Sequence, residues 1–289
     1  MGKTEMSETK NIILVKEDIL RKIYKKREKW CRKKNFGTLL VIGGSKLYPT
    51  TPILIALAAY RAGVDWVTIA SEEECCKIIA SYSPVLMVHP IKSIHDTEYL
   101  LSLSKKFDAV EIGGGLTREE NVLKSILNFL ENLEKPCVID DDAIYAVAKN
   151  KSVLINKNFV LTPHSFEFFV LSNIKLSTNL KERIEAVKKV SSQLKTTIVL
   201  KGHIDVISNG EKVAINKSGS VYMTKAGFGN TLAGILSAYL ARKIDTFTAS
   251  CAAAFVNGKA GELASKIFNE GTLPTDLIEF IPKVISKFL

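Results

Sequence analysis

The stretch from Lys225 to Ala241, KAGFGNTLAGILSAYLA, places Gly227 and Gly229 just before an apolar helical repeat. Glycine permits positive φ, so the backbone N–H groups of such a turn can converge on one point. The helix is predicted to begin at about Asn230, and its unpaired N–H groups and positive dipole end then face the loop. This arrangement binds anions, most naturally a phosphate. The competing interpretation is an ordinary helix cap with Asn230 as the N-cap.

Other glycines and polar residues follow short apolar runs that are typical of buried strands. In chain order they are Gly43-Gly44-Ser45, Gly113-Gly114-Gly115, Asp140-Asp141-Asp142, Thr162-Pro163-His164 with Glu167, and Lys201-Gly202. Open α/β sheets bind their ligands beyond the carboxyl ends of the strands. We therefore expect these motifs to lie around one cleft.

Each of these motifs also has a purely structural interpretation. The three consecutive carboxylates either begin a helix, where the dipole favours them, or hold a cation or a ribose. His164 could be only a helix cap, Lys201 a solvated strand end, and Glu167 an acid on a helix surface. Glycine triplets often do no more than form a turn.

The elements that must position these residues alternate between strand and helix almost throughout. Helices are predicted over residues 52–62, 117–133, 179–194, 246–267 and 274–289, and a hairpin over 204–216 turns at Asn209-Gly210. This alternation predicts an α/β fold with a mostly parallel central sheet and helices on both faces. We divide the chain into a basic N-terminal segment and helix, residues 1–35, and a single α/β domain, residues 36–289.

The net charge of +10 is concentrated near the N-terminus. Residues 1–36 hold twelve Lys or Arg against five Asp or Glu. Residues 1–10 are polar and expected to be disordered, and a basic helix is predicted from about Lys16 to Lys34. Such a run is more often a solvated face than a nucleic-acid surface, and few aromatic residues are interleaved with it.

The five cysteines form no CxxC pair, and their odd number at scattered positions fits reduced thiols in a cytoplasmic protein. No apolar run approaches the length needed to cross a bilayer, so we expect no membrane partner.

From about residue 33 to the C-terminus, these motifs together resemble the ADP/ATP-dependent NAD(P)H-hydrate dehydratases, a branch of the ribokinase-like superfamily. The resemblance implies a ribokinase-like fold and a homo-oligomer, a tetramer by analogy. It also implies a reaction, the dehydration that repairs hydrated NADH or NADPH. ADP or ATP would phosphorylate the hydroxyl group, with Mg²⁺ present, and the phosphate would then leave with help from the ring nitrogen.

The resemblance also implies roles for particular residues. Gly227 and Gly229 would form an anion hole for the nucleotide. Lys201, Gly202, His203, Ile204 and Asp205 would border the nucleotide; Thr51, Gly113, Gly115, His164 and Asn230 would contact the hydrate; and Glu167 would bind magnesium through water.

One departure from the family pattern affects the chemistry directly. The family places a catalytic Asp where this chain has Asn230, and an amide cannot act as a general base. Losing such a base typically costs on the order of 10²–10⁴ in rate. Asp140 or Asp142 is a candidate substitute. The chain could also be a diverged paralogue: a non-catalytic nucleotide- or dinucleotide-binding protein, or a small-alcohol kinase.

Overall fold

The computed structural model describes residues 12–289, so the expectation for residues 1–10 lies outside the described part. The strands are β1 (Ile12–Leu14), β2 (Thr38–Ile42), β3 (Trp66–Glu72), β4 (Met87–Ile91), β5 (Ala109–Ile112), β6 (Cys137–Ile139), β7 (Phe159–Leu161), β8 (Thr197–Leu200), β9 (Asp205–Ser208) and β10 (Val213–Asn216). They form one sheet in the order β1-β10-β9-β8-β7-β6-β5-β2-β3-β4. Strand β9 runs antiparallel to β8 and β10, and every other pairing in this sheet is parallel. The predicted mostly parallel sheet is confirmed.

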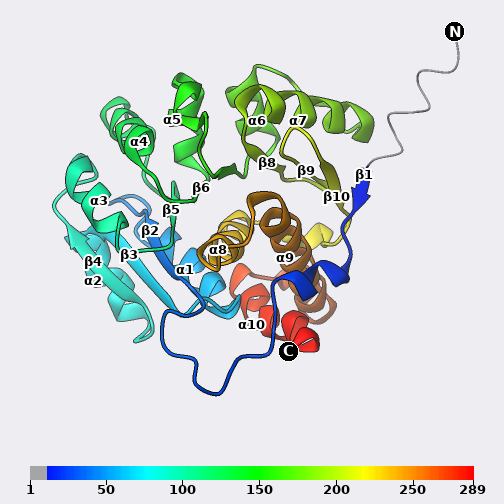
Figure 1. Ribbon diagram of the computed structural model, residues 1–289, viewed down its shortest axis with the longest axis horizontal. Helices are drawn as coiled ribbons and strands as arrows, with labels where there is room; N and C mark the ends of the chain where they lie inside the picture. The colour runs from blue at the N-terminus through cyan, green and yellow to red at the C-terminus, as the bar shows by residue number, and fades with distance from the viewer. Residues whose placement is uncertain (1–11) are drawn as a thin grey trace, which may run out of the picture.

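Helices cover both faces of this sheet (Figure 1). They are α1 (Thr51–Arg61), α2 (Glu73–Tyr82), α3 (Thr97–Ser104), α4 (Glu120–Asn132), α5 (Asp142–Lys149), α6 (Ser165–Ser172), α7 (Leu180–Leu194), α8 (Phe228–Ala241), α9 (Thr246–Phe268) and α10 (Pro274–Ile285). One buried cluster joins α1, α2, α8, α9 and α10 to the sheet, and a second joins α3 to α7 to its other face. Successive side chains of a strand point to opposite faces of the sheet, so alternate residues of the strands belong to the two clusters.

Helix α8 lies at the centre of the first cluster, with apolar residues around most of its circumference. A helix that is apolar all round is stable only when it is buried on all sides. Gly234 allows its close approach to α1, because a Cβ there would lie 2.2 Å from the carbonyl oxygen of Ile55. Among residues 12–289, no helix combines the length and apolar character needed to cross a bilayer.

Most predicted elements are found within a few residues of their expected bounds. Helix α8 begins at Phe228, two residues before the expected start, so Asn230 lies in its first turn and Gly227 is its N-cap. Gly227 has a φ of +101°, as the loop prediction required, whereas Gly229 has ordinary helical geometry. The sequence analysis assigned no elements to residues 71–105, where α2, β4 and α3 lie.

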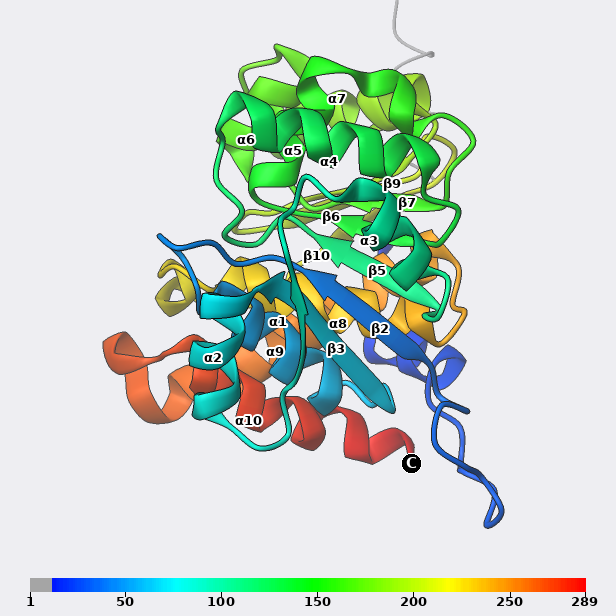
Figure 2. The same cartoon turned by 90° about the vertical axis from the view of Figure 1, so that its left-hand side faces the viewer.

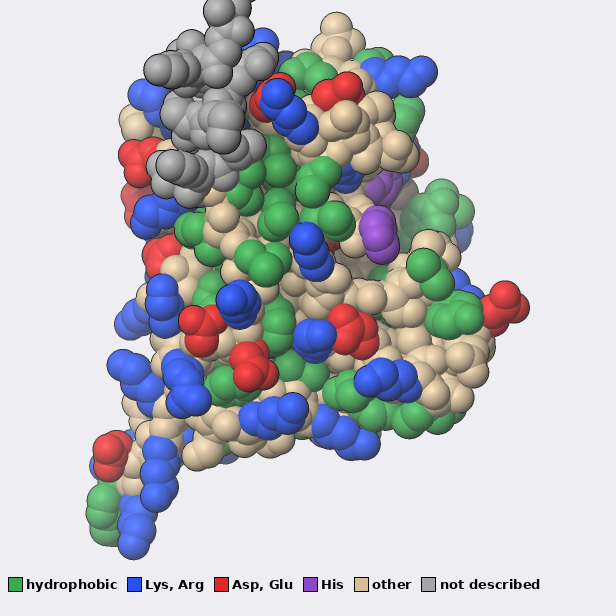
Figure 3. Space-filling model, turned by 90° about the vertical axis from the view of Figure 1, so that its right-hand side faces the viewer, with side chains coloured by type: hydrophobic (Ala, Val, Ile, Leu, Met, Phe, Trp, Pro, Cys, Tyr) green, Lys and Arg blue, Asp and Glu red, His purple; other side chains and the backbone are tan. Residues whose placement is uncertain are grey.

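The long basic helix expected from Lys16 to Lys34 is wrong. A short 3-10 helix, η2 (Glu17–Lys22), is followed by a loop that projects from the body of the protein (Figure 2) and carries exposed Lys and Arg side chains (Figure 3). Like charges three and four residues apart destabilise a helix. Ile23 and Tyr24 are instead drawn into the core, and the Tyr24 hydroxyl donates to the carbonyl of Ala62 at 2.9 Å.

Candidate functional site

The carboxyl ends of β2, β5, β6, β7 and β8 are neighbours in the sheet, and they bring the predicted motifs together. The N–H of Gly44 donates to the carbonyl of Gly114 at 2.8 Å, which joins the two glycine motifs. The N–H of Lys201 donates to the carbonyl of Pro163 at 2.9 Å, which joins the Lys-Gly motif to the Thr-Pro-His motif. The motifs therefore lie along one edge of the sheet, as expected, but not around a single cleft, because Gly44 and Lys201 line different cavities.

Two of the cavities at this edge share the first turn of α8, and a third, of about 430 Å³, lies beside Gly43-Gly44-Ser45. Gly227 and Asn230 line the larger cavity, of about 1000 Å³. Phe228 and Gly229 line the smaller cavity, of about 490 Å³. The first N–H groups of a helix have no intrahelical partner, and the N-cap Gly227 has no side chain to satisfy them. The turn thus presents free N–H groups and a positive dipole end where the two cavities adjoin.

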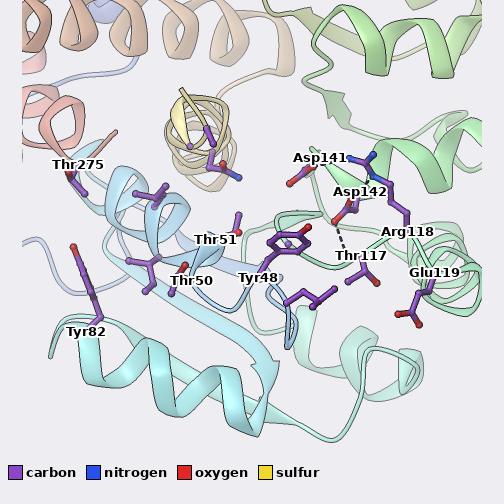
Figure 4. Close-up of a pocket in the computed structure, with 17 residues that line it drawn as sticks. Tyr48, Thr50, Thr51, Tyr82, Thr117, Arg118, Glu119, Asp141, Asp142 and Thr275 are labelled. Carbon is purple, nitrogen blue, oxygen red and sulfur yellow. Dashed lines mark hydrogen bonds and ion pairs between the residues drawn. The ribbon is translucent and has the colours of Figure 1, made fainter. Parts of the chain in front are cut away.

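The larger cavity lies between the start of α1 and the loops that follow β5 and β6 (Figure 4). Thr51, the first residue of α1, and Gly115 are both on its wall. A Cβ on Gly115 would lie 2.7 Å from the carbonyl oxygen of Tyr48, and Gly115 has a φ of +76°, so this position requires glycine. Arg118 also lines the cavity, and the sequence analysis did not identify it.

The first and third of the three consecutive carboxylates are held by other groups. Asp140 is 2% exposed and accepts hydrogen bonds from Thr162 Oγ1 at 2.7 Å and Lys201 Nζ at 2.9 Å. Asp142 begins α5, and it accepts hydrogen bonds from the backbone of Thr117 and from Arg118 Nε, each at 2.8 Å. The helix-start interpretation is correct for Asp142.

Asp141, between them, is placed differently. Its side chain is 36% exposed, and its closest cation is Arg118, with Nη2 3.9 Å from Oδ1. Burial, followed by the charges of Asp140 and Asp142, raises the pKa of Asp141 to about 6, although Lys201 and Arg118 oppose the rise. Asp141 lines the larger cavity together with Asn230.

The smaller cavity is built around Lys201, whose ammonium group pairs with two buried carboxylates. Its Nζ lies 2.9 Å from Asp140 Oδ1 and 3.8 Å from Glu167 Oε2. Burial alone would lower the pKa of Lys201, but these carboxylates raise it above its usual value. A Cβ on Gly229 would lie 3.1 Å from Lys201 Nζ, so the cation lies directly beside the first turn of α8. Lys201 is therefore a paired cation and not a solvated strand end.

His164 and Glu167 form a capping box at the start of α6. His164 Nδ1 accepts from the backbone N–H of Glu167 at 3.2 Å, and Glu167 Oε2 accepts from the backbone N–H of His164 at 2.8 Å. Burial, then the charge of Lys201, lowers the pKa of His164, so its imidazole is neutral near pH 7. Burial raises the pKa of Glu167 to about 7. The cap interpretation of His164 is correct, and its ring also lines the smaller cavity.

Gly202, His203 and Asp205 line the smaller cavity with Lys201, whereas Ile204 is not part of its wall. Asp205 accepts from the backbone of Gly202 and from Asn216 Nδ2, each at 3.0 Å. Burial raises the pKa of Asp205 to about 6 despite these hydrogen bonds.

The structure separates some residues that were expected to share a pocket. His164 is on the wall of the smaller cavity, whereas Thr51, Gly115 and Asn230 are on that of the larger. Gly113 lines neither. A Cβ on Gly113 would lie 1.8 Å from the carbonyl oxygen of Asp140, so this glycine is needed for the close approach of two strand ends.

Part of the smaller cavity's wall was missed in the sequence. It comes from the segment between β10 and α8, which includes Ser218 and Gly219, and from Asn257 and Gly258 of α9. Asn257 Oδ1 accepts from Thr231 Oγ1 at 2.7 Å, which ties α9 to the first turns of α8. An Asn-Gly pair within an Ala-rich helix was the available signal for this wall.

The sequence pattern of the NAD(P)H-hydrate dehydratases matches residues 39–283. The chain belongs to the NAD(P)H-hydrate dehydratase family. It is 36% identical over 263 residues to the bifunctional NAD(P)H-hydrate repair enzyme Nnr of Pyrobaculum aerophilum, covering 89% of this chain and 52% of that protein. The chain thus spans about half the length of this curated relative.

Two further members of this family match nearly the whole chain. The ADP-dependent (S)-NAD(P)H-hydrate dehydratase of Nitrosopumilus maritimus is 32% identical over 93% of this chain and 96% of its own length. The ADP/ATP-dependent NAD(P)H-hydrate dehydratase of Bacillus subtilis, co-crystallized with ATP/Mg²⁺, superposes with a TM-score of 0.86 at 26% identity, covering 97% of this chain and 100% of that chain. The predicted ribokinase-like fold is confirmed.

Asn230 is the residue for which the sequence predicted a departure from the family's catalytic Asp. The residue lies in the first turn of α8 and lines the larger cavity, where a ligand could reach it. An amide can donate and accept hydrogen bonds there, but it cannot take up a proton near neutral pH.

Proposed function

We propose that the protein dehydrates hydrated NADH or NADPH at the expense of ADP or ATP. The observation that carries this proposal is the sharing of the first turn of α8 by two cavities. A nucleotide in the smaller cavity and the hydroxyl group of a hydrate in the larger could then meet at the same N–H groups. The names of the relatives from Nitrosopumilus maritimus and Bacillus subtilis support the same activity.

In this proposal the nucleotide occupies the smaller cavity. The N–H groups of the turn at Gly227 and Gly229, and the ammonium group of Lys201, stabilise the negative charge of the phosphoryl group in transfer. Gly202, His203 and Asp205 border the nucleotide. The acidic Asp205 is held by its own hydrogen bonds, which point it toward Gly202 and Asn216.

The hydrate occupies the larger cavity, where Thr51, Gly115 and Asn230 contact it. Asn230 orients the hydroxyl group by hydrogen bonding. Phosphoryl transfer to that oxygen turns a poor leaving group into phosphate, so the protein mainly supplies positioning and charge stabilisation.

Magnesium would accompany the nucleotide. Among residues 12–289, no group of three or more His, Cys, Asp or Glu side chains is arranged to hold a metal ion. The oxygens of Glu167 already contact the backbone and ring of His164. Mg²⁺ usually keeps several waters and binds substrate phosphates, so the nucleotide would supply most of its ligands and Glu167 at most a contact through water.

The proposal includes a cytoplasmic location, which the scattered cysteines favour, and a homo-oligomer, a tetramer by analogy with the family. The division into residues 1–35 and a single domain of residues 36–289 stays a prediction. Residues 12–24 nevertheless pack with that domain, because β1 pairs with β10 and Tyr24 is buried in the core cluster that contains α8.

The decisive experiment is an assay of the purified protein with hydrated NADH or NADPH. We expect recovery of the nicotinamide absorbance with ADP or ATP and Mg²⁺, and none without nucleotide. Thermal unfolding with the same nucleotides should show a raised Tm, because a ligand that binds only the folded state stabilises it. No recovery of the absorbance with either nucleotide would overturn the proposal.

Asn230 favours a second candidate, a nucleotide-binding protein without catalysis. A raised Tm with ADP or ATP, together with no recovery of NADH or NADPH from the hydrate, would identify this function.

A further inference from the structure

The proposed reaction needs a group to accept the proton of the hydrate's hydroxyl, and Asn230 cannot do so. Acidic side chains on the wall of the larger cavity are the available replacements. Three line it: Glu119, Asp141 and Asp142. In Figure 4, Glu119 lies beyond Thr117, on the side away from Asp141.

The two replacements suggested by the sequence are both unavailable. Asp140 is buried, does not line the larger cavity, and accepts from Thr162 and Lys201. Asp142 is turned toward the backbone of Thr117 and is also held by Arg118 (Figure 4). Protonating either carboxylate would break an ion pair.

Asp141 remains, and its backbone sets it apart. It has a φ of +47° and a ψ of −121° at the junction of β6 and α5, a region that residues other than glycine rarely adopt. Such strain persists where surrounding contacts enforce it, often at functional sites. Here the approach of Gly113 to Asp140 and the bonds of Asp142 hold the residues on either side. The Asp141 side chain points into the cavity (Figure 4) and is 36% exposed.

We infer that Asp141 is the general base of the reaction, replacing the acid that Asn230 does not supply. The inference rests on the proposed function. The hydroxyl proton passes to the Asp141 carboxylate while the hydroxyl oxygen bonds to the terminal phosphorus of ADP or ATP. The bond from that phosphorus to the bridging oxygen breaks and releases AMP or ADP. The carbon–oxygen bond then breaks with help from the ring nitrogen, phosphate departs, and the neighbouring ring carbon loses a proton to water.

The electrostatics of the cavity suit this role. A base is most effective when its pKa lies just below the operating pH. The pKa of Asp141 is raised to about 6 by burial and by Asp140 and Asp142, against Lys201 and Arg118, which are the charged groups that act on it. Asp141 is therefore ionised at neutral pH and still able to accept a proton.

The test is the variant Asp141→Asn, with Asp18→Asn on the exposed surface as the matched control. We expect Asp141→Asn to lower kcat by about 10²–10⁴-fold, the usual effect of a general base, with the nucleotide-induced rise in Tm unchanged. Asp18→Asn should leave both unchanged.

The pH profile separates a base from a positioning residue. The wild-type kcat should fall about tenfold per pH unit below about 6, because protonated Asp141 cannot accept the hydroxyl proton. Glu167, with its pKa raised to about 7, titrates in the same range. If the fall in kcat at low pH is absent from Asp141→Asn, that fall is caused by protonation of Asp141. The double variant Asp141→Asn with Asn230→Asp should regain activity, and its kcat should fall at a different pH.

The possible failures are distinct. If the wild type does not dehydrate the hydrate with either nucleotide, both the proposed function and this inference fall. If the wild type is active and Asp141→Asn is equally active, the inference alone is overturned. If Asp141→Asn fails to fold, the wild-type pH profile decides, and a kcat that does not fall below about pH 6 would overturn the inference.

Discussion

The two cavities on either side of the first turn of α8 hold their charges differently. In the smaller, the Lys201 ammonium pairs with Asp140 and approaches Glu167, so the polar groups satisfy one another. In the larger, Arg118 pairs with Asp142 at 2.8 Å, but Asp141 has no cation closer than 3.9 Å among residues 12–289. A paired, buried charge fixes geometry, whereas an open carboxylate adds little stability and stays free to exchange a proton. The comparison suggests that one cavity is preorganised for binding and the other retains a reactive group.

The largest stability effect should come from Lys201→Met, which removes the paired cation of the smaller cavity. It leaves Asp140 and Glu167 buried without their cation, and removing one partner of a buried pair costs about 3–5 kcal/mol. Denaturant unfolding measures the loss. Lys189→Met, on an exposed position of α7, is the control and should change stability by no more than about 0.5 kcal/mol. Equal, small effects of the two variants would show that the ion pairs of Lys201 do not stabilise the fold.

Gly229→Val should remove nucleotide binding from the smaller cavity and leave the fold intact. A Cβ added at Gly229 would lie 3.1 Å from Lys201 Nζ. The methyl groups of valine would occupy the space for a phosphate. The stabilisation by nucleotide, about 2.7 kcal/mol at 100 times Kd, should disappear. Gly229→Ala is the matched variant and should lose only part of it. A full nucleotide-induced stabilisation in Gly229→Val would contradict the placement of the phosphate.

Glu111 of β5 extends the comparison to a carboxyl group that is unpaired and closed off from solvent. Both of its oxygens are buried and accept no hydrogen bond from any residue in the described range 12–289. Burial, then the charges of Asp140 and Asp141, raises its pKa well above the usual value. The folded protein therefore binds this proton more tightly than the unfolded chain. The resulting stability is present at low pH and is lost as the pH rises through the folded pKa.

Glu111→Met removes the carboxyl group whose ionisation lowers stability at high pH. We expect it to raise the free energy of unfolding by about 1–3 kcal/mol near pH 8. The gain should shrink toward pH 4, where the native carboxyl group is already protonated. Unfolding at the two pH values measures it, with Glu211→Met at the exposed hairpin turn as control. A gain independent of pH would show that packing, and not ionisation, is the cause.

The smallest effect should be that of Asp141→Asn on stability, which sharpens the comparison with Lys201. Because Asp141 is partly exposed and loosely paired, we expect a change within about 0.5 kcal/mol. Its raised pKa means that ionisation above about pH 6 weakens the fold, so any gain in the variant should appear above that pH. A large destabilisation would mean that Asp141 is a structural partner and not an open carboxylate.

Regular elements with a strong local pattern were predictable from the sequence. Helix α7 has apolar spacing that matches its geometry, and it was placed to within a residue. The segment 71–105 was not predicted, because its strand β4 contains His89 and Pro90 and only half-buries its side chains. The basic stretch before β2 misled the helix prediction, since contacts of Ile23 and Tyr24 with the core outweigh local propensity.

The sequence predicted residues of the site but not which of the two cavities each of them lines. The sequence identified the glycine turn because it precedes an apolar helix, and Lys201 and the three carboxylates because they follow strands. It could not tell which carboxylate is open, since Asp140, Asp141 and Asp142 are adjacent and chemically identical. Their difference arises from partners far away in the chain, such as Lys201 for Asp140.

By itself, then, the order of residues determined the α/β sheet, its glycine-rich carboxyl edge and the amide at position 230, because these depend on side-chain type and short-range spacing. Tertiary structure alone decided that one helix turn belongs to two cavities, that Lys201 is closely paired, and that Asp141 has only a distant cation. Ion pairing and burial depend on distances between residues remote in sequence, and those distances are set only when the strands assemble.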